Sequence, residues 1–198
     1  MATVVVPFRS TDPKRRLAAV RDADRVRLAR AMLADVLAAA TPLGEVVVVA
    51  HEAPPPSSGV RHVPDPHHGQ GAAVRAALDA AVAWGLPAPY LVVNADLPCA
   101  TPRDLLALAG AAPEDGLAYV AAADGTTNAL ALSDAQLFEP VYGPGSASRF
   151  AALGPSTALD APNLGDDVDT PGDLTRLGDR LGQHTRRVLA ALRLETAA

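Results

Sequence analysis

The sequence contains one cysteine, one lysine and no long apolar run. The single cysteine, Cys99, cannot form an internal disulfide, which favours a reducing compartment. No stretch approaches the roughly 20 consecutive apolar residues of a membrane span, so we expect no membrane segment. Residues 1–7 are typical of a strand rather than a signal peptide, because their apolar run follows no basic segment. These absences together predict a cytoplasmic protein.

Basic residues are fewer than acidic ones. The chain has 17 lysines and arginines and 22 aspartates and glutamates, so its net charge is −5. This balance excludes the broad basic surface that nucleic-acid binding requires. The basic residues nonetheless gather at one place, because Arg9, Lys14, Arg15 and Arg16 follow the first predicted strand closely.

Several common site motifs are absent too. No G-x-G-x-x-G loop, P-loop or zinc-ligand spacing of Cys and His occurs, and no Ser–His or Cys–His pair is evident. We interpret Cys99 as a small loop or core residue, because no base is arranged to activate it. His67 and His68 are adjacent, and neighbouring side chains seldom bind one ion together, so we interpret them as exposed loop histidines.

Length and patterning predict one α/β domain spanning 1–198. A chain of 198 residues, 49% of them hydrophobic, can bury a substantial core. Apolar runs rich in β-branched residues predict strands at 3–7, 46–49, about 60–63, 90–94, 117–122 and 128–132. Helical spacing and capping signals predict helices at 24–40, at 71–84, from Thr101 onward, and at about 147–153, 171–181 and 183–194.

The order of these elements predicts the sheet. Alternating helices and valine-rich strands favour a mostly parallel sheet covered by helices on both faces. The strands at 117–122 and 128–132 have no long helix between them, and Asp124-Gly125 is a turn signal, so we expect them to make the sheet mixed. The predicted fold class is therefore α/β, a three-layer Rossmann-like domain with a mostly parallel mixed sheet.

Two acidic clusters are the main candidates for a site. Asp96 follows the predicted strand 90–94, and we expect Asp167 and Asp169 to lie at the end of another strand. Carboxylates at strand ends point into the crevice where open α/β sheets bind ligands, and residues two apart in an extended chain share one face. Three carboxylates there would suit Mg²⁺ and the phosphates of a nucleotide. The alternative is that Asp96 only ends a strand and that the pair is a solvated loop before a helix cap.

Three glycine-rich turns are further candidates. Gly69-Gln70-Gly71 precedes a helix and can approach a phosphate or a nucleoside, since helix amides and the helix dipole favour an anion. We expect Gly125-Thr126-Thr127-Asn128 and Gly143-Pro144-Gly145-Ser146 to expose backbone amides beside hydroxyls. Such groups hold a carboxylate or a phosphate without a full positive charge. The alternative for each segment is an ordinary turn.

In sequence order, these motifs resemble one known family. The chain carries Val-Pro-Phe-Arg at 6–9, Lys-Arg-Arg-Leu at 14–17, Asp-Leu-Pro at 96–98, Gly-Thr-Thr-Asn at 125–128, Gly-Pro-Gly-Ser at 143–146 and Asp-Val-Asp-Thr-Pro-Gly-Asp-Leu at 167–174. Over about residues 3–180 it resembles the 2-phospho-L-lactate / phosphoenolpyruvate guanylyltransferase family of coenzyme F-420 (deazaflavin) biosynthesis. The resemblance implies a glycosyltransferase-A-like nucleotidyltransferase fold. It also implies that the phosphate of a small phospho-acid attacks the α-phosphorus of GTP and that pyrophosphate leaves.

The resemblance also implies roles for particular residues. The metal ligands, expected to hold two Mg²⁺ ions, would be Asp96, Asp167 and Asp169. The groups expected to bind the substrate carboxylate would be Thr127, Gly143 and Ser146. The nucleotide-binding residues would be Arg9, Lys14, Gly69, Gly71 and Asp96, and the catalytic residues would be Asp96, Lys14 and Arg16.

Two other functions stay open. One is another nucleotidyltransferase of the same fold, of the sugar-phosphate or molybdopterin type, although this chain lacks the Leu-Ala-Gly-Gly-x-Gly-x-Arg loop usual in those relatives. The other is a non-catalytic nucleotide-binding protein, because Arg9 replaces a usual lysine and Gly69-Gln70-Gly71 replaces Gly-Leu-Asn. The expected partners are GTP, a phospho-acid (phosphoenolpyruvate or 2-phospho-L-lactate) and a downstream deazaflavin phospho-acid transferase. The amphipathic helix expected at 183–194 would either pack on a partner subunit and form a homodimer or cover the sheet of its own chain.

Overall fold

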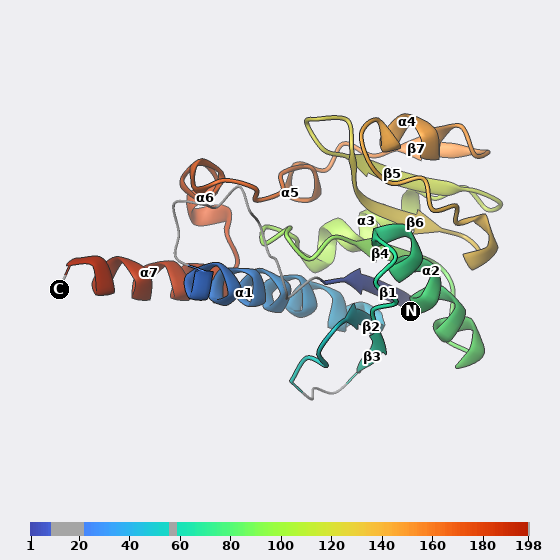
Figure 1. Ribbon diagram of the computed structural model, residues 1–198. Coiled ribbons are helices and arrows are strands. Elements are labelled where there is room, and N and C mark those ends of the chain that lie inside the picture. Colours follow the sequence, from blue (N-terminus) through green and yellow to red (C-terminus); the bar gives the residue numbers. More distant parts are fainter. Residues whose placement is uncertain (9–21, 56–58, 198) are drawn as a thin grey trace.

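The computed structural model describes residues 1–8, 22–55 and 59–197, and one seven-stranded sheet forms its middle layer (Figure 1). The strands are β1 Ala2–Pro7, β2 Gly44–Ala50, β3 Val60–Pro64, β4 Tyr90–Val93, β5 Leu117–Ala121, β6 Thr127–Leu132 and β7 Ser156–Ala158. The α-helices are α1 Asp22–Ala40, α2 Gln70–Ala83, α3 Pro102–Ala111, α4 Ser146–Ala151, α5 Pro162–Gly165, α6 Pro171–Leu177 and α7 Gln183–Ala197. Short 3₁₀ turns are η2 Thr41–Leu43, η3 Ala135–Leu137 and η4 Gly178–Arg180.

The strands are ordered β3-β2-β1-β4-β6-β5-β7. Every neighbouring pair is parallel except the two pairs that β6 makes with β4 and β5. The order reverses between β1 and β4, which is the switch point where open α/β sheets form a ligand crevice. The mostly parallel mixed sheet of the sequence prediction is therefore confirmed.

Valines of the central strands build the core on both faces of the sheet. In β1, Val4 and Val6 pack on the side of α1 and α3, whereas Val5 packs on the side of α2. Successive strand side chains point to opposite faces, so a continuous valine run requires helices on both sides. All three valines are fully buried, which confirms the predicted three layers.

The C-terminal helix α7, red in Figure 1, packs against α1, which is blue. Asp35 of α1 is buried, and its two carboxylate oxygens accept the backbone N–H groups of His184 (2.8 Å) and Thr185 (2.9 Å). A carboxylate is favourable there because the first amides of a helix lack helical partners and carry partial positive charge. Asp35 therefore fastens the start of α7 to the body of the protein.

Local signals predict the helix starts well and the helix ends less well. Thr101 and Thr170 both form capping boxes, with Asp104 and Asp173 respectively. The helix expected at 171–181 stops earlier, because Gly178 at φ 48° leaves the helical conformation and a 3₁₀ turn follows. Within the described residues, no helix combines the length and the apolar composition needed to span a membrane.

Candidate functional site

The carboxyl ends of the parallel strands meet at one edge of the sheet. β1 ends there at Pro7 and β4 at Val93. Because β6 runs in the opposite direction, it begins at this same edge with Thr127. The backbone N–H of Asn94 donates to the carbonyl of Asn128 (3.0 Å), which joins the end of β4 to the start of β6. Segments far apart in the sequence thus meet at the switch point.

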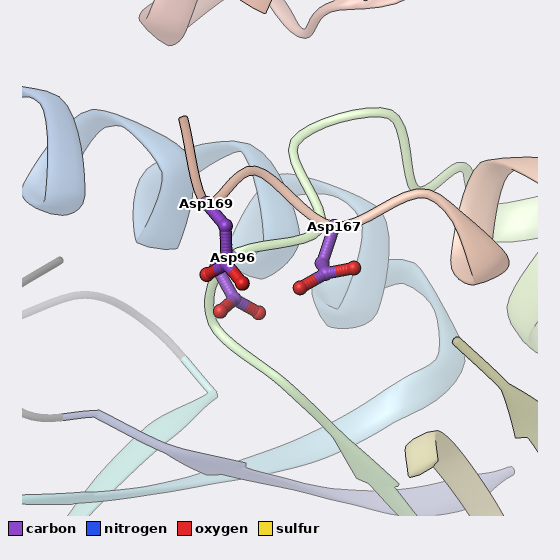
Figure 2. Close-up of side chains that lie close together, drawn as sticks. All are labelled: Asp96, Asp167 and Asp169. Atoms are coloured by element: carbon purple, nitrogen blue, oxygen red, sulfur yellow. The ribbon is translucent and has the colours of Figure 1, made fainter. Parts of the chain in front are cut away.

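Three aspartates converge at this edge. One carboxylate oxygen from each of Asp96, Asp167 and Asp169 lies within 4.8 Å of the other two. Figure 2 shows Asp96 on the segment after β4 facing the other two, which come from the segment between α5 and α6. All three side chains are partly buried. The structure therefore brings together the three carboxylates that the sequence singles out as metal ligands.

The second acidic cluster does not follow a strand, and that prediction is wrong. Pro162 opens the short helix α5, and residues 166–169 continue without regular secondary structure up to the cap of α6. The expected shared face of Asp167 and Asp169 is nevertheless present, because Val168 between them is fully buried. The N–H of Val168 donates to the carbonyl of Asp96 (3.1 Å), and this bond joins the two acidic segments.

The three carboxylates fit a hard divalent cation. Mg²⁺ and Mn²⁺ prefer oxygen ligands, and Mg²⁺ binds them octahedrally at about 2.0–2.1 Å. Ligands on opposite sides of such an ion lie about 4 Å apart, which follows from twice that bond length. The separations here, at most 4.8 Å, need only small side-chain rotations to reach that geometry. Such an ion would also offset the repulsion of three negative charges.

A cavity of ≈ 200 Å³ lies at the switch point, and Asp96 is one of its lining residues. Its walls come from the ends of β1, β2, β3 and β4 and from α1 and α2, and its polar groups are Asp65, Gln70, Asn94 and Asp96. A larger hollow of ≈ 810 Å³ lies between α1 and the segment after β2, and its lining includes none of the predicted site residues. The smaller cavity is therefore the one that belongs to the carboxylate site.

The two other glycine-rich segments meet through hydroxyl groups. The side-chain oxygens of Thr127 and Ser146 lie 3.1 Å apart, and both residues are buried. We expected free backbone amides here, and this expectation is wrong at Ser146, whose N–H donates to Gly143. The N–H of Thr126 likewise donates to the Asp124 carboxylate. These turns use such amides to close themselves, and the hydroxyls of Thr127 and Ser146 contact each other.

Asn94 is a site residue that the sequence reasoning missed. Its side-chain oxygen accepts from the Gln70 amide (2.7 Å), and its side-chain nitrogen donates to the carbonyl of Thr127 (3.3 Å). It therefore links the glycine turn before α2 to the hydroxyl pair. The signal in the sequence was its place, directly after a buried strand and two residues before Asp96.

The structure explains why glycine is needed at both Gly69 and Gly71. Gly69 has φ 92°, a left-handed conformation that side chains rarely adopt. A Cβ on Gly71 would lie 2.6 Å from the Cβ of Pro140, so this glycine permits close packing. The predicted nucleotide contacts of both glycines stay predictions. His67 and His68 are exposed, as expected.

The remaining predicted residues divide into two groups. Arg9, Lys14, Arg15 and Arg16 lie outside the described residues, so their roles stay predictions. Cys99 is a buried residue of the cluster between α1, α6 and α7, as the interpretation of a core cysteine requires. Burial raises the pKa of its thiol, and this effect exceeds the opposing attraction from Arg180. Such a thiol is a poor nucleophile.

Asp166 stands apart from the three converging carboxylates. Its two oxygens accept from Arg176 (2.7 Å) and Arg180 (2.8 Å). Partial burial alone would raise its pKa, but the hydrogen bonds and charges of the two arginines outweigh burial and lower the pKa below its ordinary value. Asp166 is therefore ionised and engaged by protein cations rather than turned toward the cavity.

Comparison with known proteins shows the family to which the chain belongs. The family model described as MobA-like NTP transferase domain matches residues 25–152. The chain is 35% identical to 2-phospho-L-lactate guanylyltransferase of Natrialba magadii, covering 88% of this chain and 82% of that protein. It is 36% identical to phosphoenolpyruvate guanylyltransferase of Nocardia farcinica, covering 86% of this chain and 81% of that protein.

Solved structures support the fold. A crystal structure described as that of a nucleotide-diphospho-sugar transferase from Desulfovibrio desulfuricans G20 superposes with a TM-score of 0.69. It covers 100% of this chain and 96% of its own, at 15% identity. This likeness confirms the three-layer α/β fold that the sequence predicts.

Proposed function

The chain belongs to the 2-phospho-L-lactate / phosphoenolpyruvate guanylyltransferase family. We propose that it transfers GMP from GTP to 2-phospho-L-lactate or phosphoenolpyruvate. The observation that carries the proposal is the convergence of Asp96, Asp167 and Asp169 at the switch point, within a chain so similar to named guanylyltransferases. The proposed setting is coenzyme F-420 biosynthesis in the cytoplasm, with a deazaflavin phospho-acid transferase using the product.

The three aspartates are the proposed ligands for Mg²⁺. With Mg²⁺ bound, the site gains positive charge that orients phosphoryl oxygens and stabilises the charge developing on them during displacement at phosphorus. Asp96 lines the cavity, and one carboxylate oxygen from each of Asp167 and Asp169 lies within 4.8 Å of an Asp96 oxygen. In-line displacement then requires mainly that the protein position the two substrates. This matches a site whose described residues include no activated nucleophile.

The hydroxyl pair is the proposed holder of the acid. Thr127 and Ser146 lie at the β6 side of the edge, and Asn94 connects them to the turn before α2. Buried hydroxyls bind a carboxylate well, because hydrogen bonds to a charged acceptor are stronger than neutral ones. The attacking phosphate of the acid is already ionised near neutral pH, so the proposed reaction needs no strong general base.

The nucleotide is proposed to occupy the cavity of ≈ 200 Å³ and the edge beside it. A cavity of this size holds only part of a nucleotide, since pockets for ligands of that class usually measure about 300–1,000 Å³. The triphosphate would lie toward Asp96, where Arg9, Lys14 and Arg16 are the proposed cationic partners. Cationic groups there would stabilise the departing pyrophosphate.

Pyrophosphate release tests this function. With GTP and Mg²⁺, we expect release that requires phosphoenolpyruvate or 2-phospho-L-lactate, with the downstream transferase present to remove product. Comparison of GTP with CTP, UTP and ATP should show a preference for GTP. Preference for another nucleotide would favour a different transferase of this fold, and GTP binding without release would favour a non-catalytic protein.

Removal of the Ser146 hydroxyl tests the acid site. We expect Ser146→Ala to raise the KM for the phospho-acid about 10-fold, the equivalent of one lost hydrogen bond to a charged group. The KM for GTP should stay within about twofold, because the hydroxyl would not touch the nucleotide. Steady-state kinetics with each substrate varied in turn measures both constants.

Thr126→Val is the matched control for that experiment. The Thr126 hydroxyl donates to Asp124 and does not join the buried pair, so this variant should keep both KM values. An equal rise in both KM values for Ser146→Ala would contradict the assignment, and so would a rise in the acid KM for Thr126→Val.

A further inference from the structure

The segment that carries Asp167 and Asp169 has no regular secondary structure, yet it is held at three points. Asp166 at its start accepts from Arg176 and Arg180. In its middle, the backbone N–H of Val168 donates to the backbone carbonyl of Asp96 (3.1 Å). At its end, one oxygen of Asp173 accepts the N–H groups of Asp169 (3.1 Å) and Thr170 (2.8 Å).

At the first of these points, two arginines form salt bridges with Asp166. Each carboxylate oxygen of Asp166 accepts a hydrogen bond from one guanidinium, that of Arg176 at 2.7 Å and that of Arg180 at 2.8 Å. Arg176 also donates to the second oxygen of Asp173 (3.2 Å), and Arg180 donates through two nitrogens to Asn163. One hydrogen-bonded network therefore joins α5, the acidic segment, α6 and η4.

This network has a reason in electrostatics. Three carboxylates within 4.8 Å of one another repel, and an unrestrained loop would relieve that repulsion by moving Asp167 and Asp169 away from Asp96. A loop held by charge-assisted bonds keeps the ligands close before a cation arrives. Residues that orient metal ligands in this way typically change metal affinity or activity about 10–100-fold when they are replaced.

Resting on the proposed function, we propose that Asp166, with Arg176, is a positioning residue that preorganises Asp167 and Asp169 for a divalent cation. Asp166 holds no cation itself, because both of its oxygens are occupied by arginines. Arg176 holds the segment from both ends, since it contacts Asp166 before the ligands and Asp173 after them.

Direct binding of Mn²⁺ to the full chain, measured by calorimetry without substrates, tests the proposal. We expect Asp166→Asn to weaken Mn²⁺ binding about 10-fold. Arg176→Gln distinguishes the effect of lost positioning on Mn²⁺ affinity from the effect of the changed charge. Removal of a positive group near a cation site would strengthen binding by charge alone, whereas lost positioning should weaken it. A weaker affinity in both variants is the expected result.

The pair of Glu45 and Arg61 supplies matched controls. Arg61 of β3 donates to Glu45 of the neighbouring strand β2 at 2.9 Å. These two side chains are about as exposed to solvent as those of Asp166, Arg176 and Arg180. Glu45→Gln and Arg61→Gln remove the same charges at a distance from the aspartates, so Mn²⁺ affinity should stay unchanged. Thermal unfolding of all four variants shows whether each is folded.

The outcomes separate this inference from the proposed function. Unchanged Mn²⁺ affinity in folded Asp166→Asn, or tighter binding in Arg176→Gln, would overturn the positioning role. Failure of the unmodified chain to bind Mn²⁺ would overturn both that role and the proposed metal site. Weakened binding in the two variants, together with no GMP transfer by the unmodified chain, would support the positioning role and reject the guanylyltransferase.

Discussion

Asp96→Ala and Asp169→Ala are each expected to lower kcat roughly 10³-fold or more, because the proposed metal supplies several kcal/mol of transition-state stabilisation. Each variant removes one of three oxygens that lie within 4.8 Å of one another. Two remaining carboxylates would bind a divalent ion weakly and in altered geometry. Turnover measured across a range of Mg²⁺ concentrations gives both the loss of rate and the change in metal requirement.

The fold should persist in these variants. Three neighbouring carboxylates repel, so the loss of one relieves repulsion in the folded state. We therefore expect each variant to fold, and thermal unfolding measures this. Asp160→Ala is the matched control, because Asp160 is exposed on the segment before α5 and belongs to no metal-ligand group of the described residues. Full activity in Asp96→Ala would reject the metal assignment, and so would a large loss in Asp160→Ala.

Asp35→Ala is expected to lower the free energy of unfolding by about 3–6 kcal/mol, because it removes two hydrogen bonds to a charged acceptor. The change leaves the N–H groups of His184 and Thr185 without the carboxylate that now accepts them at 2.8 and 2.9 Å. It also removes a negative charge from the positive end of α7. Urea unfolding measures the loss as a lower midpoint.

Two variants sharpen this result. Asp35→Asn keeps the shape and one acceptor oxygen, so its loss should be smaller than that of Asp35→Ala. Asp79→Ala is the control, since Asp79 is an exposed helical aspartate 4.0 Å from Arg75, and its removal should change stability by less than about 0.5 kcal/mol. A loss of that small size in Asp35→Ala would contradict the proposed fastening of α7.

The strands and caps could be predicted because their signals are local. The valine run at 46–49 demands burial on both faces, and β2 is buried as expected. Thr101 and Thr170 carry the spacing of a capping box, and both boxes form. The family resemblance, carried by motifs spread over the chain, is also confirmed.

Other features escaped prediction because they depend on distant partners or on very short elements. The strand β7 has three residues and mostly exposed side chains, so it shows no apolar alternation. The acidic pair was expected after a strand, because the sequence shows a carboxylate pattern but not the backbone bond between Val168 and Asp96 that aligns it. The link from Gln70 through Asn94 to Thr127 likewise spans separate elements.

The central claim is that GMP moves from GTP to a phospho-acid, and the most direct measurement follows labelled phosphorus in GTP. Two GTP samples, labelled at the α- or the γ-phosphorus, are incubated with Mg²⁺, the protein and either phosphoenolpyruvate or 2-phospho-L-lactate. We expect the α-label in a new species that also contains the acid, and the γ-label in the released pyrophosphate. Release of the γ-label as inorganic phosphate, or an α-label that stays in GTP with both acids, would contradict this claim.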